Sequence, residues 1–394
     1  MKILTLSNLY PRPDRPTFGM FNGQLFGQMA TTEGVSLRNI CLVPEWRLWR
    51  WRHIRGWSAP SGSVPGTRYQ PVFYLPIIGR QWSARLYCWW NAALKHEVQK
   101  ADVVYASWLF PDGVAAAHLA ESTNVKVWIM VLGSDTYHLR DANRRAQIQA
   151  VDARVAGYVC VCQTVAQRLV DVGIASERIH VVPNGVDPKR FYYVAPSQAH
   201  EHLSKTLESP LRAAIADGIS VLFVGNLVME KGPDLCLDAF IAAAGTDNKR
   251  RLVFIGQGAM QASLERRVQD AGLSERVHFV GNRPHTEIVH WMALADVLCL
   301  SSRTEGMPNV VLEALACGCP VIASDVGACD EMLNDEPAGQ VVPPGDVPAL
   351  RDAMTKIFDI VTDRVALSAR HGVYTWHDQA NTIVQLLGEE MDCD

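Results

Sequence analysis

The sequence of 394 residues lacks several features that would assign it to other classes of protein. Basic residues are not in excess, since 37 Lys and Arg stand against 41 Asp and Glu, and the net charge of −4 gives no reason to expect nucleic acid as a partner. No stretch approaches the roughly 18 apolar residues that a membrane-spanning helix needs. The N-terminal segment MKILTLSNL has a short apolar run without a small-residue cleavage pattern, and it therefore predicts a first strand rather than a signal peptide.

Metal-binding and dinucleotide-binding patterns are also missing. The ten cysteines are scattered through apolar segments, and the two Cys-x-Cys pairs have no His or Cys partners at the spacing of a zinc site. Such scattered thiols favour buried, reduced cysteines in the cytoplasm over disulfides. The segment LVFIGQG contains Gly256 and Gly258, but Gln261 stands where a dinucleotide-binding fingerprint has its third glycine, which argues against a nicotinamide cofactor.

The composition is that of a globular protein, with 48% hydrophobic and 20% charged residues over a length sufficient for two domains. Apolar strand-like runs alternate with helical patterns from Lys2–Ser7 onward, and the alternation starts again at Ile219–Val224 with five further strand and helix units. This order predicts an α/β fold with two open parallel sheets, each between layers of helices. The Asn184-Gly185 turn predicts a connector, and the residues that follow it to about Asp217 are expected to be a linker.

The stretch Ser301–Pro320, SSRTEGMPNVVLEALACGCP, carries the most specific pattern in the chain. It follows the apolar run Ala295–Leu300, and Pro308 stands where a helix would begin, because a proline costs no hydrogen bond in the first turn. A strand, a short loop and a helix N-terminus present backbone N–H groups and the positive end of the helix dipole, and this arrangement favours an anion. The residues expected around that anion are Gly306, Met307, Pro308, Asn309 and Val310.

Two carboxylates bracket the expected anion site. Glu305 lies in the loop, and Glu313 lies five residues after Pro308, about 7 Å further along a helix that rises roughly 1.5 Å per residue. An ionised Glu313 in the apolar helix VVLEALACG would be costly without a partner. A nucleotide-diphosphate sugar suits both carboxylates, with Glu313 on the ribose hydroxyls and Glu305 on the transferred sugar. The plainer alternative is a helix-capping Glu305 and a solvent-facing Glu313.

The spacing Glu305-x7-Glu313 within EGMPNVVLEALACGCPVIASDVG resembles the signature of the family-4 (group 1) retaining glycosyltransferases, two-domain enzymes of the GT-B fold. The resemblance implies GT-B architecture, with two Rossmann-like parallel-sheet domains facing a cleft. Residues 1–187 would form the acceptor-side domain, joined by a C-terminal helix at about residues 375–394, and residues 188–374 would bind the nucleotide sugar. The implied reaction transfers a sugar from a UDP- or GDP-linked donor to a hydroxyl acceptor with retention of configuration.

The loop that runs from Gly225-Asn226 to Lys231 precedes a predicted helix and would put an ammonium group beside the diphosphate, so Lys231 is the expected phosphate ligand. Many relatives have arginine where Asn226 stands, and the resemblance therefore implies that this site has one fixed charge fewer. Arg303 is a candidate to replace that charge. An Asp-x-Asp occurs only in the C-terminal tail, DCD, so no divalent metal or other cofactor is expected to hold the diphosphate.

Four further site residues come from the resemblance. Gly19, at the start of a helical pattern, resembles the family's first glycine loop, which approaches the donor phosphate and the acceptor. Asn282 and Arg283 resemble a loop that contacts the nucleobase in relatives. The segment Leu132-Gly-Ser-Asp135 matches a His-Gly-x-Asp pattern except that Leu132 replaces the histidine. Asp135 is expected to face the sugar or the acceptor, with a helix cap as the alternative.

The expected catalytic residues are Glu305, Lys231 and Asp135. Lys231 and the amides at the helix N-terminus would stabilise the leaving diphosphate, and Glu305 would orient the sugar. No separate nucleophile is evident, which favours a front-face displacement. Two other classes of function stay open. One is a nucleotide-sugar epimerase of similar fold. The other is a catalytically weak nucleotide-sugar-binding partner subunit, which the departures from the family pattern at Leu132 and Asn226 favour.

The segment Trp46–Trp57, WRLWRWRHIRGW, contains four tryptophans and four arginines without an acidic residue. Indole and guanidinium groups together suit a membrane interface that carries anionic lipid. The alternative is an aromatic core patch or an ordinary surface loop. With the resemblance, this segment predicts a lipid-linked acceptor, as in the synthesis of a bacterial surface polysaccharide, and a cytoplasmic enzyme that is peripheral on the inner face of the cell membrane.

Overall fold

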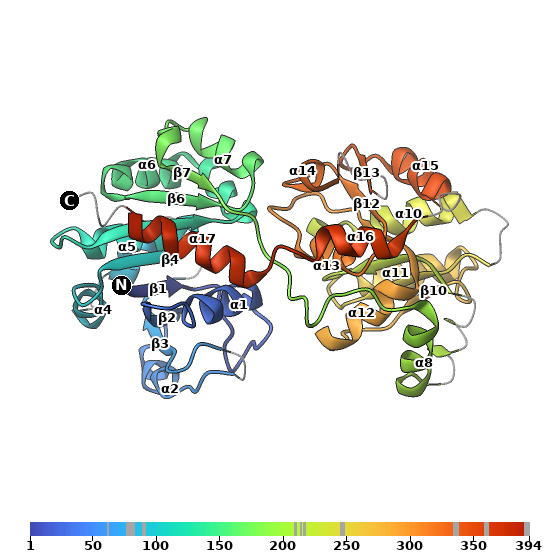
Figure 1. Ribbon diagram of the computed structural model, residues 1–394, viewed down its shortest axis with the longest axis horizontal. Helices are drawn as coiled ribbons and strands as arrows, with labels where there is room; N and C mark the ends of the chain where they lie inside the picture. Colours follow the sequence, from blue (N-terminus) through green and yellow to red (C-terminus); the bar gives the residue numbers. More distant parts are fainter. Residues whose placement is uncertain are drawn as a thin grey trace. The chain divides into compact units, whose positions relative to one another are not determined.

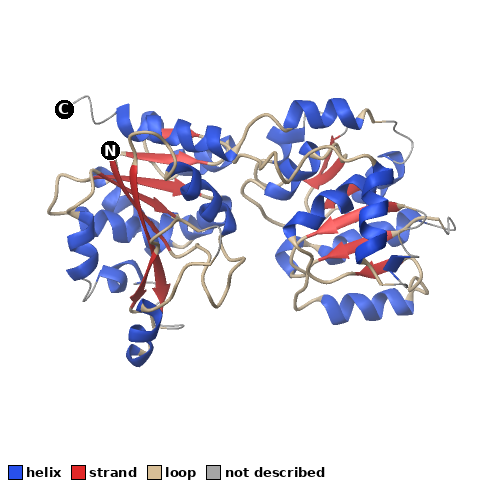
Figure 2. Ribbon diagram, turned by 60° about the horizontal axis from the view of Figure 1, so that its bottom comes forward, coloured by secondary structure: helices blue, strands red, loops and turns tan. Residues whose placement is uncertain are grey.

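The computed structural model describes residues 1–60, 63–75, 83–88, 92–208, 211–212, 215, 218–244, 249–333, 339–357 and 362–389. The chain forms two compact units. The first unit is Met1–Asn184 together with the C-terminal helix α17 (Trp376–Glu389), and the second unit is Gly185–Thr375. In each unit a parallel sheet lies between helices (Figure 1 and Figure 2), so the predicted α/β class with two parallel-sheet domains is confirmed.

The described strands of the first unit form a seven-stranded parallel sheet in the order β3-β2-β1-β4-β5-β6-β7. They are β1 (Lys2–Ser7), β2 (Ser36–Pro44), β3 (Arg68–Val72), β4 (Val103–Ser107), β5 (Lys126–Val131), β6 (Gly157–Cys160) and β7 (Ile179–Val181). The central strands β1, β4 and β5 are buried along almost their whole length, as expected of parallel strands that helices cover on both faces. Ile3 pairs with both Leu37 and Val103, which places β1 between β2 and β4.

The helices of the first unit follow its strands along the chain. They are α1 (Met20–Met29), η1 (Leu48–Arg50), α2 (Trp51–Arg55), α3 (Ser83–Cys88), α4 (Ala92–Val98), η3 (Leu109–Gly113), α5 (Val114–Ala120), η4 (Gly133–Arg140), α6 (Ala142–Val151), η5 (Asp152–Arg154), α7 (Gln163–Val170), η6 (Ser176–Arg178) and α17. Helix α17 packs against α1, with Ala380 and Ile383 buried and Thr32 Oγ1 donating a hydrogen bond to Asn381 Oδ1 at 3.3 Å. The end of the chain therefore completes the first unit.

The described strands of the second unit form a six-stranded parallel sheet in the order β10-β9-β8-β11-β12-β13. They are β8 (Ile219–Val224), β9 (Leu252–Ile255), β10 (Val277–Phe279), β11 (Ala295–Leu300), β12 (Val321–Ser324) and β13 (Gly339–Val342). The helices are α8 (Pro196–Thr206), η7 (Met229–Lys231), α10 (Pro233–Ala244), α11 (Gln261–Asp270), α12 (His285–Leu294), α13 (Asn309–Ala316), α14 (Cys329–Leu333), α15 (Val347–Ile357) and α16 (Arg364–His371). Strands β8 and β11 have the bounds that their apolar runs predicted.

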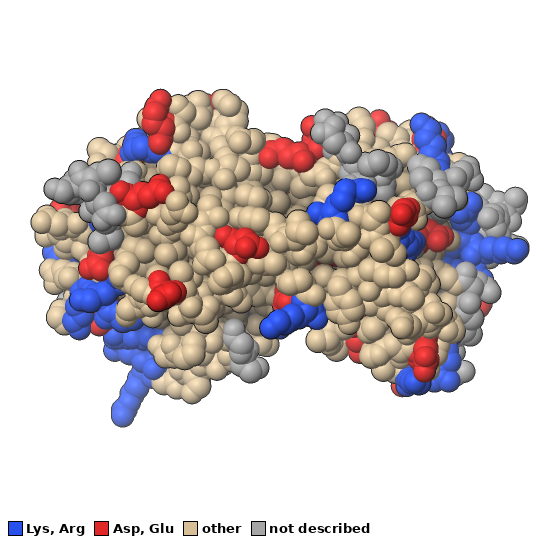
Figure 3. Space-filling view, viewed as in Figure 1, with Lys and Arg blue, Asp and Glu red and all other residues tan. Residues whose placement is uncertain are grey.

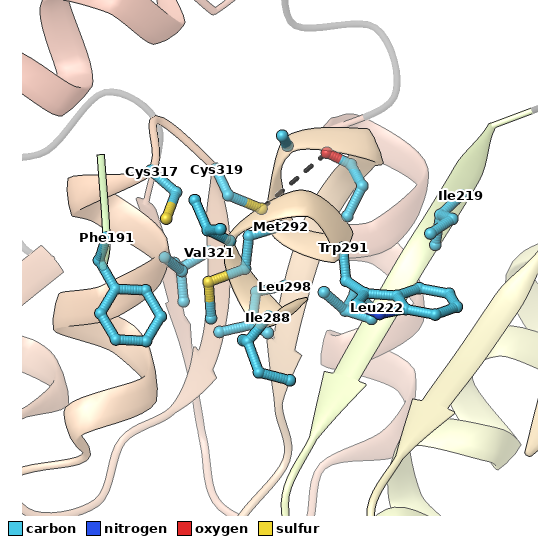
Figure 4. Close-up of a cluster of buried hydrophobic side chains, with 14 of the residues drawn as sticks. Phe191, Ile219, Leu222, Ile288, Trp291, Met292, Leu298, Cys317, Cys319 and Val321 are labelled. Atoms are coloured by element: carbon cyan, nitrogen blue, oxygen red, sulfur yellow. Dashed lines mark hydrogen bonds between the residues drawn. The ribbon is translucent and has the colours of Figure 1, made fainter. Parts of the chain in front are cut away.

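A hydrophobic core lies on each face of the second sheet. Successive residues of β11 alternate between them, with Leu298 in one core and Val297 in the other, because side chains of a strand point to opposite faces. Figure 4 shows part of the core that contains Leu298, in which Trp291 of α12 lies near Leu222 of β8. Burying a large apolar side chain contributes about 1.5–3 kcal/mol. These cores hold in place the two central strands whose loops carry the candidate site.

Two expectations about the second unit differ from the structure. The stretch expected to be a linker contains α8, whose Ala199 and Leu203 are buried in the same core as α12. Their helical spacing is a weak signal in a sequence that is otherwise polar, and contact with α12 rather than propensity stabilises this helix. Pro308 precedes the first helical residue of α13, because its ψ of 103° is extended.

Candidate functional site

Lys231 and Glu305 meet at the carboxyl edge of the second sheet. Strands β8 and β11 are neighbours in this sheet, and the loops that follow them carry these two residues. Lys231 Nζ donates a hydrogen bond to Glu305 Oε1 at 2.6 Å, and Ser302 Oγ donates to the same oxygen at 2.7 Å. The Lys231 side chain is 35% exposed and that of Glu305 is 10% exposed, so the pair is accessible from solvent. The structure thus brings together two residues that the sequence predicted separately.

The position of Lys231 depends on a tight turn. Lys231 ends η7, and Gly232 follows with a φ of +63°. A Cβ atom at Gly232 would lie 2.0 Å from Ser301 O, so only glycine lets this turn pack against the loop after β11. Ser301 Oγ donates a hydrogen bond to Gly232 O at 2.7 Å and so joins the two loops.

The predicted anion site surrounds the start of α13. Pro308 is buried, and the other residues are half-buried, namely Glu305, Gly306, Met307, Asn309 and Val310. Gly306 O accepts a hydrogen bond from Ala328 N at 2.7 Å, and a Cβ atom at Gly327 would lie 2.0 Å from the same oxygen. The loop after β12 therefore fixes the path of the chain into α13, at the end of the helix where the dipole is positive.

Glu313 lies in α13 with 16% of its side chain exposed. Its Oε1 lies 3.3 Å from Nε2 of His285, the first residue of α12. The His285 ring packs edge-on against Phe191, with the ring centroids 5.0 Å apart. His285 is thus a polar partner of Glu313 within an otherwise apolar helix. Sequence reasoning missed it, because the two residues lie on different helices and no local pattern connects them.

The remaining donor-side residues lie on loops at the same edge of the second sheet. Gly225 and Asn226 follow β8, and Asn226 is exposed. Asn282 and Arg283 follow β10, with Asn282 exposed and the Arg283 guanidinium 6.0 Å from the ring centroid of Trp291. Loops at the carboxyl ends of parallel strands are where open α/β sheets bind ligands. These residues therefore lie at the ligand-binding edge that is typical of such sheets, within this unit.

Gly19 and Asp135 belong to the first unit. Gly19 precedes α1 with a φ of +66°, and a Cβ atom there would lie 2.4 Å from Leu9 C. Asp135 is fully buried, and its Oδ2 accepts hydrogen bonds from Leu109 N at 2.9 Å and Leu132 N at 3.1 Å. Burial raises the pKa of Asp135 to about 7, although these hydrogen bonds act to lower it. Within its own unit Asp135 joins the loops after β4 and β5, as in the helix-cap alternative.

The carboxyl edge of the first sheet also carries Trp108 and Asp112, two residues that the sequence did not single out. Trp108, directly after β4, has a φ of +123°, a conformation that costs about 1–3 kcal/mol in a non-glycine residue. Trp108 N donates a hydrogen bond to Met130 O at 3.1 Å. Asp112 is fully buried, accepts hydrogen bonds from Asn8 N at 2.6 Å and Asn8 Nδ2 at 3.2 Å, and has a pKa that burial raises.

The segment Trp46–Trp57 forms an exposed surface of the first unit. Its large apolar side chains are 77% exposed at Trp49, 52% at Trp46 and 51% at Leu48. Arg52 and Arg55 are also exposed. Figure 3 shows basic side chains gathered at the end of the first unit where Figure 1 places α2. An aromatic core patch, one alternative from the sequence, therefore does not describe these side chains.

Glu45, the residue before this segment, is buried and anchors it. Its Oε1 accepts a hydrogen bond from Arg47 Nε at 2.9 Å, and its Oε2 accepts one from Arg50 Nη1 at 3.0 Å. Trp51 Nε1 donates to Glu45 O at 3.2 Å. The hydrogen bond from the Arg47 side chain lowers the pKa of Glu45 despite its burial. Two of the four arginines are thus committed to one carboxylate, which fixes the backbone that carries the exposed indoles.

Three properties of the described residues concern metals, membranes and thiols. Their His, Cys, Asp and Glu side chains form no group of three or more that could hold a metal ion. Their helices all fall short of the length and apolar character that crossing a bilayer demands. Their cysteines are free, and all except Cys88 are buried.

Two known families match the chain. Glycosyltransferase Family 4 matches residues 50–190, and Glycosyl transferases group 1 matches residues 212–370. The second match contains the Lys231 and Glu305 pair together with Glu313.

Individual proteins are similar over different shares of the chain. A protein named as the teichuronic acid biosynthesis glycosyltransferase TuaC, from Bacillus subtilis (strain 168), is 26% identical over 371 residues, which cover 90% of this chain and 89% of TuaC. The amylovoran biosynthesis glycosyltransferase AmsK of Erwinia amylovora is 28% identical over 220 residues, 54% of this chain and 50% of AmsK. The crystal structure of Anabaena HepE in complex with UDP matches 99% of this chain and 100% of HepE, with a TM-score of 0.75 and 17% identity.

Proposed function

Because the chain belongs to the group 1 and family 4 glycosyltransferases and has their GT-B fold, we propose that it transfers a sugar from a nucleotide diphosphate to a hydroxyl acceptor with retention of configuration. The donor is UDP- or GDP-linked, and the acceptor is a lipid-linked or polysaccharide intermediate of a bacterial surface polysaccharide. The names of TuaC and AmsK, which refer to teichuronic acid and amylovoran biosynthesis, support this acceptor class. The UDP bound to HepE supports the donor class.

The observation that carries the proposal is the contact of Lys231 with Glu305 on neighbouring loops. A transferring sugar leaves behind a diphosphate whose negative charge grows as the bond from the anomeric carbon to the phosphate oxygen breaks. The Lys231 ammonium, fixed in advance, stabilises that charge. Glu305 then accepts hydrogen bonds from the sugar hydroxyls and holds the anomeric carbon toward the acceptor.

The acceptor oxygen attacks on the face from which the diphosphate leaves. Its proton passes to the departing phosphate oxygen, so the new glycosidic bond replaces the old one and no covalent enzyme intermediate forms. The positive end of α13 adds to the stabilisation of the diphosphate. Glu313, held by His285, binds the ribose hydroxyls of the nucleotide. The proposed reaction uses no metal or other cofactor, because Lys231 and the helix N-terminus supply the positive charge.

Thermal-shift binding of UDP, GDP, ADP and their common sugars, each with and without magnesium, tests the donor site. A nucleotide present at 100 times its Kd should stabilise the protein by about 2.7 kcal/mol. We expect one nucleotide to stabilise the native protein without magnesium and to lose this effect in Lys231→Ala and Glu313→Ala. Lys205→Ala is the matched control, since Lys205 also pairs with a glutamate but is 71% exposed on α8.

The remaining outcomes lead to other functions. If no nucleotide or nucleotide sugar stabilises the protein, the catalytically weak partner subunit replaces the transferase. If the donor alone is converted to an epimeric sugar in the absence of acceptor, the protein is an epimerase. Proton NMR of the first product distinguishes retention from inversion at the anomeric carbon.

The Trp46–Trp57 surface supports contact of this enzyme with the inner face of the cell membrane. Trp46, Leu48 and Trp49 expose apolar side chains, and indole groups such as those of Trp46 and Trp49 are enriched at membrane interfaces. Exposed Arg52 and Arg55 add about 1 kcal/mol each near an anionic lipid surface. These electrostatic terms add to the apolar contribution of the exposed indoles, and together they would bring the enzyme to a lipid-linked acceptor.

Vesicle sedimentation tests this contact. Native protein should sediment with vesicles that contain phosphatidylglycerol, weakly with pure phosphatidylcholine, and less with either as salt increases. Trp49→Ser and the Arg52→Gln/Arg55→Gln double variant should each reduce sedimentation, whereas Tyr192→Ser, at an exposed aromatic residue of the second unit, should not. Equal sedimentation by native protein and both variants would contradict the membrane contact and leave the donor-site proposal intact.

A further inference from the structure

We infer that Arg303 is a positioning residue of the donor site, which holds the loop that carries Lys231 in place for the diphosphate of a nucleotide sugar. This role rests on the proposed function, since it concerns the same site. Arg303 lies in the loop after β11, two residues before Glu305. It therefore connects the two loops that supply the proposed phosphate and sugar ligands.

Arg303 holds the Lys231 loop through four hydrogen bonds. Its backbone N–H donates to Glu230 O at 2.8 Å, and its Nη1 donates to Met229 O at 2.7 Å. Nη1 and Nη2 donate to Asp234 Oδ1 at 2.9 Å and Asp234 Oδ2 at 2.6 Å. Met229 begins η7, and Asp234 lies in the first turn of α10. Lys231 thus lies between the two points at which the guanidinium is attached.

This set of bonds requires a guanidinium. Its planar fork donates two parallel N–H bonds to a carboxylate, and the same group still reaches a backbone carbonyl. A lysine ammonium is a single point charge on a flexible stem and cannot hold both partners in one geometry. Burial acts to raise the pKa of Asp234, but the hydrogen bond and charge of Arg303 outweigh it and lower this pKa. The two parallel bonds to Asp234 and the bond to Met229 O together fix the guanidinium between these partners.

The same contacts separate Arg303 from a direct phosphate ligand. The sequence suggested that Arg303 replaces a positive charge missing at Asn226. In the structure its guanidinium is balanced by the Asp234 carboxylate and the Met229 carbonyl. Asn226 is exposed and neutral, so binding of a diphosphate depends strongly on where Lys231 is held. Arg303 supplies that position and leaves the phosphate contact to Lys231.

Kinetics of four variants test this role. Arg303→Met removes the guanidinium with its bonds to Met229 O and Asp234, whereas Asp234→Asn removes only the charged partner. Arg303→Lys keeps the charge without the fork, and Arg351→Met removes the exposed ion pair with Asp352 as a control. We expect Arg303→Met and Asp234→Asn each to lower kcat/KM for the donor on the order of 10- to 100-fold. Arg303→Lys should fall nearly as far, the control should match native protein, and the acceptor KM should not change. The Arg303→Met/Asp234→Asn double variant should lose no more than Arg303→Met alone, because without the guanidinium the side chain of residue 234 has no part in the attachment.

Hydrogen exchange measures the attachment without any ligand. The backbone amides of Lys231 and Gly232 donate hydrogen bonds within the η7 turn. In Arg303→Met these two amides should exchange faster than in native protein, because the turn has lost its attachment to the neighbouring loop. In Arg351→Met they should exchange at the native rate.

Two results would overturn this role. One is weak nucleotide binding by Arg303→Met together with native or tighter binding by Asp234→Asn, since a guanidinium released from its carboxylate would then be contacting phosphate. The other is native exchange at Lys231 and Gly232 in Arg303→Met. If native protein binds no nucleotide at all, the proposed function fails by itself, and the exchange rates still decide whether Arg303 holds the loop.

Discussion

The carboxyl edges of the two sheets use charge in different ways. In the second unit, Lys231 and Glu305 come from loops after the neighbouring strands β8 and β11, bind each other, and remain partly exposed. In the first unit, Asp112 and Asp135 lie after the neighbouring strands β4 and β5, are fully buried, and bind backbone N–H groups. A charged group can bind a ligand only if it reaches solvent, whereas a buried carboxylate serves the loops around it. The carboxyl edges of two similar sheets therefore differ in whether these charged groups are accessible or buried.

The largest expected effect is on the pH dependence of stability, measured as the free energy of unfolding of Asp135→Asn relative to native protein. It would sharpen the contrast between the two edges. The pKa of Asp135 is raised from 3.8 to about 7 in the folded protein, so between these values the unfolded chain loses a proton that the folded chain keeps. The stability that this group contributes is present below its unfolded pKa and is lost as the pH rises through the folded pKa. Asn cannot ionise, so the free energy of unfolding of Asp135→Asn relative to native protein should rise by about 4 kcal/mol between pH 4 and pH 7.5.

Denaturant unfolding at several pH values across this range measures that difference. If the free energies of unfolding of the two proteins differ by the same amount at every pH, Asp135 ionises normally. The contrast between a buried and an accessible edge would then not hold for this residue.

The next effect concerns the accessible edge. Glu305→Gln keeps the shape of the side chain and removes its charge, so kcat should fall on the order of 10²- to 10³-fold, as for other groups that act in the transition state. Stability should change little, because the glutamine oxygen can still accept the hydrogen bonds that Lys231 Nζ and Ser302 Oγ donate to Glu305. Steady-state kinetics and a melting curve of the same sample provide both quantities. A native kcat in Glu305→Gln would show that Glu305 does not act in the transition state, and full biological activity without measurable transfer would favour the partner-subunit function.

A smaller effect separates loop geometry from chemistry. Gly232→Ala and Gly272→Ala both place a Cβ atom at a positive φ, but only the one at Gly232 meets backbone, 2.0 Å from Ser301 O. Gly272→Ala should cost about 1–2 kcal/mol of stability from the backbone conformation alone. Gly232→Ala should cost roughly 1–3 kcal/mol more and also weaken donor binding, because the turn that holds Lys231 must move. Equal unfolding free energies for the two variants would show that the loops do not need this close contact.

The smallest expected effect is at His285. His285→Ala removes the imidazole next to Glu313 and a ring that packs against Phe191. Loss of one partly exposed ion-pair contact costs roughly 0–1 kcal/mol, so nucleotide affinity should fall a few fold and kcat should stay near native. Isothermal titration with the nucleotide identified by thermal shift measures this change. A loss as large as that of Glu313→Ala would instead assign His285 a direct contact with the nucleotide.

Much of the fold could be predicted from local sequence. The apolar runs of β8 and β11 have the predicted bounds, because strands covered on both faces consist of nearly continuous apolar residues. The prediction was less accurate where local pattern was weak. Helix α8 was missed, because only Ala199 and Leu203 show its buried face and α12 supplies the packing that stabilises it.

For the candidate site, the sequence alone determined which residues lie on which loop or helix. The strand, proline and Glu305-x7-Glu313 spacing put Glu305 in a loop and Glu313 within the following helix, and both are found there. Hydrogen bonding within a few residues and the covalent order of the chain decide such placements.

Only the tertiary structure decided which residues meet. Lys231 reaches Glu305 because β8 and β11 are adjacent in the sheet, and Arg303 reaches Asp234 across the same pair of loops. The place of Asp135 in the interior likewise depends on the packing of η3 and η4 around it. Contacts between distant parts of the chain follow from strand order and side-chain packing, and burial follows from both, so local sequence does not contain them.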